Sequence, residues 1–111
     1  MKIKTAELTG FALAWAVFRL ETADARTAKK IYEAMSAFFP AVDWSQGGPI
    51  IERERISVEA VEDEETENWR AYLDWRTDEA LQDGPTPLIA AMRCYVASKL
   101  GDEVDVPDEL M

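Results

Sequence analysis

The sequence predicts an α+β fold: two N-terminal helices, a β-hairpin that forms a small antiparallel sheet, and a buried C-terminal helix. Three patterns indicate this class: helical spacing of apolar residues near the N-terminus, alternation after residue 55, and a sharply bounded apolar segment from residue 87 to 100. The chain has 111 residues, 48% of them hydrophobic. This length fits a single domain, residues 1–111, whose last residues (about eight) form an acidic extended tail.

Both N-terminal helices are predicted before residue 40. Apolar residues recur at helical spacing up to Leu20, and Thr5 or Thr9 is placed to cap this first helix after a short extended lead-in. The second helix is expected over residues 24–38. Pro40 ends it, because a residue that precedes proline is pushed out of the α region.

The middle of the chain predicts a loop and then a hairpin. Residues 43–49, DWSQGGP, are expected to form a loop, since two adjacent glycines permit unusual backbone angles, and Pro49 then opens a short helical turn. Residues 56–60 and 69–75 alternate with period two and predict antiparallel strands joined by an acidic loop. The inward faces of these strands are expected to supply core side chains, namely Ile56, Val58, Trp69, Leu73 and Trp75.

The C-terminal helix has the clearest start and stop in the chain. Asp83 or Thr86 caps it, Pro87 lies in its first turn, and Gly101 follows Leu100 as a left-handed stop. Between these limits the helix is apolar almost all the way round, which predicts burial on more than one side. Its small side chains leave room for another element to approach closely.

Arg93 interrupts this apolar helix. A buried guanidinium needs a partner, because an unpaired one costs on the order of several kcal/mol. The candidate partners are Asp43, Glu52 and Glu54, which would make an internal ion pair between the loop and the helix. The other interpretation is an anion-binding arginine that lines a pocket.

The segment DWSQGGPIIERER is the best candidate binding site. Glycine N–H groups can face an anion, the tryptophan can stack on a ring, and the glutamine can read a hydrogen-bonding edge. The alternative is a glycine turn with the tryptophan in the core. The candidate binding residues are Asp43, Trp44, Gln46, Gly47, Gly48, Glu52, Arg53 and Arg93.

The composition argues against an enzyme. The chain has no histidine and one cysteine, so it lacks the commonest general base, and neither Cys94 nor any serine has a base to activate it. The same counts make a structural zinc site nearly impossible. We therefore predict no catalytic residues, no metal site and no cofactor, and Cys94 is expected to be a small core residue.

The net charge of −10 is unevenly distributed. Residues 1–42 hold six basic and four acidic side chains, whereas residues 43–111 hold six basic and eighteen acidic ones. Repulsion from phosphates makes direct nucleic-acid binding unfavourable, and a protein partner with a basic surface is expected. No segment is long enough to cross a membrane, and one cysteine suits a reducing compartment, so we expect a cytoplasmic protein.

Three blocks of the sequence resemble the NinX-like family of small phage and prophage proteins: KIKTAELTGFALAWAV, DWSQGGPIIERE and GPTPLIAAMRCYVASKLGDEVDVPDEL. The family is of unknown function. The resemblance implies an accessory protein of the phage early operon, made in a bacterial cytoplasm. It assigns no role to the residues that match the shared pattern, which are Asp43, Trp44, Gln46, Gly47, Gly48, Glu52, Arg53, Arg93 and Cys94.

Three functions are compatible with these patterns. The first is a non-catalytic binding protein that acts on a host or phage protein and, if that partner handles nucleic acid, mimics the charge of DNA. The second is a small-molecule or nucleotide (anion) pocket between the Asp43–Glu54 block and Arg93, with weak enzymatic activity conceivable. The third is a homo-oligomer that associates through the small face of the C-terminal helix.

Overall fold

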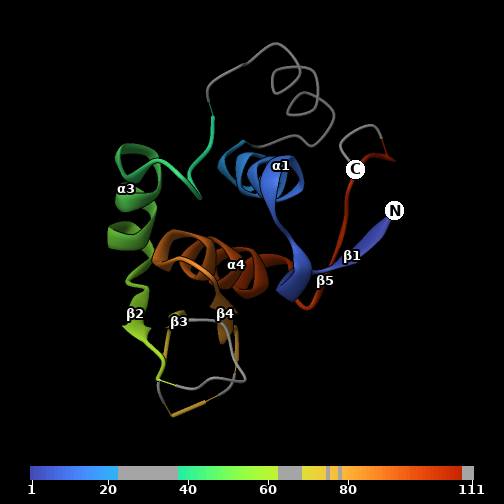
Figure 1. Cartoon of the computed structure of the whole chain (residues 1–111). Helices are drawn as coiled ribbons and strands as arrows, with labels where there is room; N and C mark the ends of the chain where they lie inside the picture. Colours follow the sequence, from blue (N-terminus) through green and yellow to red (C-terminus); the bar gives the residue numbers. More distant parts are fainter. Residues whose placement is uncertain (23–37, 63–68, 75, 78, 109–111) are drawn as a thin grey trace.

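The computed structural model describes residues 1–22, 38–62, 69–74, 76–77 and 79–108. The predicted α+β class is confirmed (Figure 1). The predicted second helix falls on residues 24–37, outside the described residues, whereas Phe38 is described and lies outside any helix. The elements in chain order are β1 (Lys2–Lys4), the 3-10 helix η1 (Thr5–Glu7), α1 (Gly10–Glu21), α3 (Trp44–Glu54), β2 (Ser57–Ala60), β3 (Trp69–Tyr72), β4 (Gln82–Gly84), α4 (Pro87–Leu100) and β5 (Glu103–Asp105).

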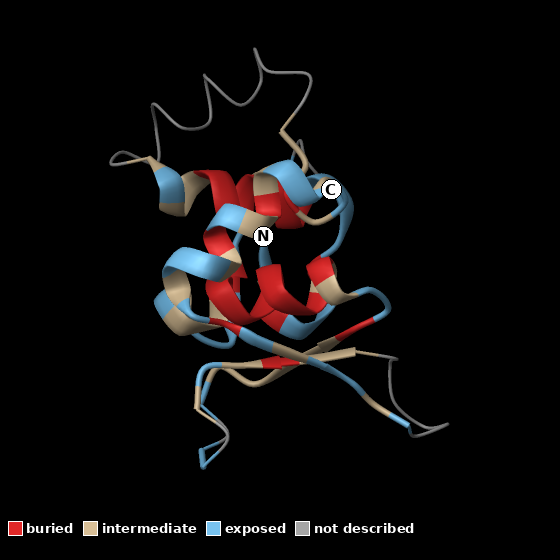
Figure 2. Cartoon of the chain, turned by 90° about the vertical axis from the view of Figure 1, so that its left-hand side faces the viewer, coloured by how far each residue is buried: buried red, intermediate tan, exposed pale blue. Residues whose placement is uncertain are grey.

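Helix α4 lies at the centre of the molecule. It is covered by α1 on one side, by the sheet of β2, β3 and β4 on the other, and by α3 at its flank (Figure 1). Its side chains from Ala90 to Val96 are all buried, as are those of α1 from Ala12 to Phe18 (Figure 2). This position between two layers is the reason that the helix is apolar almost all the way round. It also places the small face of α4 inside the fold.

The predicted boundaries of α4 are confirmed, with one correction at its end. Thr86 is the cap: its side chain accepts a hydrogen bond of 3.1 Å from the N–H of Ile89, and Pro87 is the first helical residue. Gly101 has φ +85° as expected of a stop, but its ψ of −157° is extended rather than left-handed helical. The chain therefore turns directly into β5. In helix α1, Thr9 rather than Thr5 occupies the cap position.

The predicted hairpin is confirmed and gains a third strand. β2 pairs antiparallel with β3, with Val58 opposite Ala71, and β3 pairs with β4, with Arg70 opposite Asp83. The turn expected before α4 thus contains a strand that its polar sequence does not indicate. The inward placement of Leu73 is wrong: it is 41% exposed, because the strand ends at Tyr72 and the chain bends. Trp75 lies outside the described residues.

Residues 103–105, where the acidic tail begins, form a second small sheet with the N-terminal strand. β5 pairs antiparallel with β1, with Ile3 opposite Val104. The N-terminal amine of Met1 lies 3.1 Å from carboxylates of both Asp105 and Asp108, and these contacts raise the pKa of the amine. A pairing between the two ends of a chain leaves no local pattern, so the sequence predicted only an extended segment here.

The predicted loop over residues 43–49 is wrong, because these residues begin helix α3. Asp43 is the N-cap, with its carboxylate accepting from the N–H of Ser45 at 2.9 Å. Neither glycine has a positive φ, and Pro49 lies inside the helix. Packing against α4 compensates for a composition that disfavours an isolated helix.

Within the described residues, no helix combines the length and apolar character required to cross a bilayer.

Candidate functional site

Most polar residues of the candidate segment hold the segment itself in place. Asp43 caps α3 through both the N–H and the hydroxyl of Ser45, the latter at 2.6 Å. Gln46 accepts a hydrogen bond of 2.6 Å from the N–H of Phe39, which fixes the chain that enters the helix. The roles predicted for Asp43 and Gln46 as ligand contacts thus compete with structural roles that both side chains already fill.

The two glycines of α3 have different surroundings. A Cβ on Gly47 would overlap the carbonyl oxygen of Pro40 and lie 2.7 Å from the Cδ2 of Leu88. A Cβ on Gly48 would meet nothing within 4 Å. Gly47 therefore lets α3 pack closely on the rest of the fold, whereas no contact within the described residues requires glycine at position 48.

Arg93 contacts backbone carbonyls. Its Nε donates to the carbonyl of Leu8 at 2.9 Å and its NH1 donates to the carbonyl of Asp83 at 2.8 Å. The guanidinium thus joins α4 to the start of α1 and to β4, and the residue is only 6% exposed. The predicted pairing with the Asp43–Glu54 block is replaced by these contacts. The sequence could not reveal them, because every residue supplies a carbonyl.

Two carboxylates that were candidates for Arg93 have other partners. Asp43 caps its own helix, and Glu54 lies 2.8 Å from the Nε of Arg53 and 3.3 Å from the Nζ of Lys99. These two cations lower the pKa of Glu54. Glu52 is exposed on α3.

Arg53 is the centre of a polar cluster that links three helices. Its NH1 and NH2 donate to both carboxylate oxygens of Glu21 at 3.0 and 2.9 Å, and its NH2 also contacts the Tyr95 hydroxyl at 3.2 Å. Tyr95 donates to Glu21 at 2.8 Å. Burial and this carboxylate raise the pKa of Tyr95, so its hydroxyl keeps its proton. The cluster joins the end of α1 to α3 and α4.

Cys94 is buried on α4, as expected of a core residue. Burial raises the pKa of its thiol to about 12. A thiol with this pKa carries almost no thiolate at neutral pH and is a poor nucleophile. In the part of the chain that the structure describes, no group of three or more cysteine, aspartate or glutamate side chains is arranged to hold a metal ion.

Trp44 is the one candidate residue with a large apolar surface open to solvent. It is 57% exposed on the first turn of α3, and the adjacent Val42 is 73% exposed. The interpretation of Trp44 as a core residue is therefore wrong. Trp44 borders a hollow of about 230 Å³, whose other lining residues are Ala41, Val42, Thr86, Pro87 and Leu88. We call these six residues the Trp44 surface.

Sequence reasoning identified Trp44 but missed the rest of this surface. Val42 and Pro87 lie far apart in sequence, and they meet only because α3 packs beside the start of α4. Tyr95 and Glu21 were missed as members of the Arg53 cluster for the same reason. An arginine in the last turn of α3 was a signal for ion pairing, but it did not reveal the partners.

The family model described as "Bacteriophage P22, NinX" matches residues 4–99. The chain belongs to the NinX family. The match spans α1, α3, the three-stranded sheet and all of α4 except its last residue, so the Trp44 surface and the Arg53 cluster both lie within it. A search of curated proteins found no match. Family membership makes this NinX-family protein a phage accessory protein.

Proposed function

We propose that this NinX-family protein is a non-catalytic binding protein whose partner is a host or phage protein with a basic surface. The observation that carries this proposal is the exposed Trp44 beside an apolar hollow, on a helix held by its own cap and by the Gln46 contact. Tryptophan is enriched among the residues that dominate protein interfaces. A rigid aromatic side chain next to a hollow loses little conformational entropy when a partner covers it.

The glycine at position 48 also supports the proposal that a partner binds beside Trp44. Residues 44, 48 and 52 are spaced four apart and so lie on one side of a helix. Glycine within a helix costs about 0.5–1 kcal/mol relative to alanine, and no described residue gives a steric reason for it at position 48. A partner that approaches the helix backbone closely beside Trp44 would supply that reason.

The charge of the chain specifies the partner further. The net charge is −10, and the excess of acidic residues falls on residues 43–111, which contain four of the six residues of the Trp44 surface. A basic rim around the partner's tryptophan-accepting site would accelerate association and disfavour acidic competitors. Binding should therefore weaken as salt concentration rises.

The contacts of Arg93 support this function over the anion pocket. The guanidinium is buried and donates to two backbone carbonyls, which suits a structural role. A thermal-shift screen with nucleotides and inorganic phosphate tests directly whether the protein binds an anion. A rise in melting temperature that Arg53→Ala abolishes would favour the pocket instead.

The experiment for the proposed function is capture from host and phage-infected lysates on C-terminally immobilised protein, followed by affinity measurement with each captured protein. Trp44→Ala should lose the partner while the protein stays folded. Gly48→Ala should weaken binding and melt at or above the wild-type temperature. Leu73→Ala is the matched control, because Leu73 is also an exposed apolar residue but follows β3. A captured protein supports the proposal only if the Trp44→Ala variant fails to capture it.

Two outcomes would overturn the proposal. One is a set of captured proteins that is the same for the wild type and for Trp44→Ala. The other is concentration-dependent self-association in sedimentation experiments that Trp44→Ala abolishes, because the Trp44 surface would then join two copies of this chain.

A further inference from the structure

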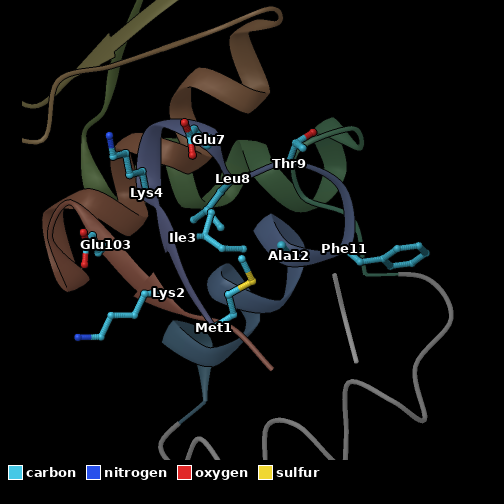
Figure 3. Close-up of a pocket in the computed structure, with 10 residues that line it drawn as sticks. All are labelled: Met1, Lys2, Ile3, Lys4, Glu7, Leu8, Thr9, Phe11, Ala12 and Glu103. Atoms are coloured by element: carbon cyan, nitrogen blue, oxygen red, sulfur yellow. The ribbon is translucent and has the colours of Figure 1, made fainter. Parts of the chain in front are cut away.

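Among the described residues, no strand pairs with the edge of β1 that faces away from β5, and an apolar groove lies beside it. The groove has a volume of about 540 Å³ and is lined by residues of β1, η1 and the start of α1, together with Glu103 of β5. Figure 3 shows Ile3 pointing toward Ala12, with Leu8 beside it and Phe11 at the outer rim. Phe11 is 60% exposed and Met1 is 64% exposed, so much of the apolar lining faces solvent.

The register of the β1–β5 pair shows which backbone groups are free for another strand. Met1 and Val106 exchange two backbone hydrogen bonds of 2.9 Å, and the N–H of Thr5 donates to the carbonyl of Asp102 at 2.7 Å. Hydrogen-bonded and non-hydrogen-bonded pairs alternate in an antiparallel ladder. The N–H and C=O of Lys2 and the N–H of Lys4 therefore point away from β5.

Contacts within the protein fix both ends of β1, so the edge that would bind a partner strand is already ordered. Salt bridges from the Met1 amine to Asp105 and Asp108 fix the start of β1, and Thr5 anchors its end by donating from its hydroxyl to the carbonyl of Gly101 at 2.6 Å. An added strand would thus meet backbone donors and acceptors that are already ordered, which lowers the entropic cost of binding.

The lysines on β1 indicate the chemistry of that strand. Lys2 and Lys4 are exposed and extend to the side opposite Ala12 (Figure 3). A second copy of β1 would place lysine opposite lysine, and like charges directly across a ladder are destabilising. Asp105 and Glu103 of β5 already lie opposite Lys2 and Lys4 on one side. Glutamate or aspartate at the same positions of an added strand would place each lysine between two carboxylates, which is favourable. The residue between them would face Ile3 and enter the groove.

We propose that β1 accepts an extended segment of a partner protein as an added antiparallel strand, with acidic residues opposite Lys2 and Lys4 and an apolar residue against Ile3. The occupant is a strand of alternating acidic and apolar residues, bound by β-augmentation. This surface is distinct from the Trp44 surface.

The test is a titration of the ¹⁵N-labelled protein with an acetylated and amidated pentapeptide of alternating glutamate and valine, followed by NMR. Saturable shifts of the Lys2 and Lys4 amide signals are expected. Lys4→Pro removes the outward N–H, and Lys4 already has φ −63°, which suits proline. Lys4→Ala is the matched control, since it removes the charge but keeps the N–H. Lys4→Pro should bind the peptide about three- to tenfold more weakly than Lys4→Ala.

N-methylated peptides test the register on the unaltered protein. A glutamate opposite Lys2 directs its N–H toward β1, so methylation of the glutamate nitrogens should abolish binding. Methylation of the valine nitrogens should leave binding intact. The proposal is overturned if the glutamate–valine peptide causes no saturable shift, if a lysine–valine peptide binds equally well, or if the two methylated peptides bind alike.

Discussion

Replacing each glycine of α3 by alanine in turn should change stability in opposite directions. Alanine at position 48 adds a methyl group to open space, so it should stabilise the protein by about 0.5–1 kcal/mol, the difference in helix propensity. Alanine at position 47 places the same methyl group against a backbone carbonyl and a buried leucine. Overpacking typically costs about 1–3 kcal/mol.

The magnitude at position 47 depends on how far its neighbours can move. The carbonyl belongs to Pro40, which is fully buried, and the Cδ2 of Leu88 would lie 2.7 Å from the new methyl group. Neither is the end of an exposed, flexible side chain, so the cost should fall in the upper part of that range. After the gain in propensity is subtracted, Gly47→Ala should destabilise the protein by about 1–2 kcal/mol.

The assay is urea unfolding followed by tryptophan fluorescence, together with scanning calorimetry. For a chain of this length, 1 kcal/mol corresponds to about 4 °C in melting temperature. Gly48→Ala should therefore melt about 2–4 °C above the wild type and Gly47→Ala about 4–8 °C below it. Equal shifts for the two variants, or a Gly47→Ala variant as stable as the wild type, would refute the close packing of α3 on Pro40 and Leu88.

Three further predictions concern α4 and its contacts. Arg93→Met should destabilise the protein by about 2–4 kcal/mol in urea unfolding, because it leaves one buried and one partly buried carbonyl without this donor; wild-type stability would contradict that role. The pKa of Glu54 is lowered by Arg53 and Lys99, so its contribution is present at pH 7 and is lost as pH falls below about 4.5. Glu54→Gln should therefore cost about 1 kcal/mol at pH 7 and less at pH 3, and an equal loss at both values would refute this pairing. Cys94 should react with a thiol reagent at pH 8 only after denaturation, and fast labelling of the native protein would show that its thiol is not buried.

Elements with a local pattern could be predicted from the sequence. The α4 boundaries follow from the Thr86 cap, the proline after it and the glycine at its end, each of which acts within one helical turn. The β2–β3 hairpin follows from period-two alternation, and the burial of Cys94 and Arg93 follows from the apolar surroundings of both residues in the helix.

Elements that depend on distant contacts could not be predicted. The DWSQGGP segment has the composition of a loop, yet it forms a helix because Asp43 caps it and Gly47 lets it pack against α4. The strands β4 and β5 are three residues long and exist through pairing with β3 and β1. No property of three residues alone indicates such a partner.

The sequence by itself determined the α+β class, the central apolar helix with its limits, the acidic character and the NinX family. The tertiary structure decided what each candidate residue contacts. It directed Arg93 to backbone carbonyls, joined Arg53 to Glu21 and Tyr95, and left Trp44 exposed beside a hollow. The physical reason is that helix propensity and periodicity act between near neighbours, whereas ion pairs, grooves and free strand edges form only when distant segments pack together.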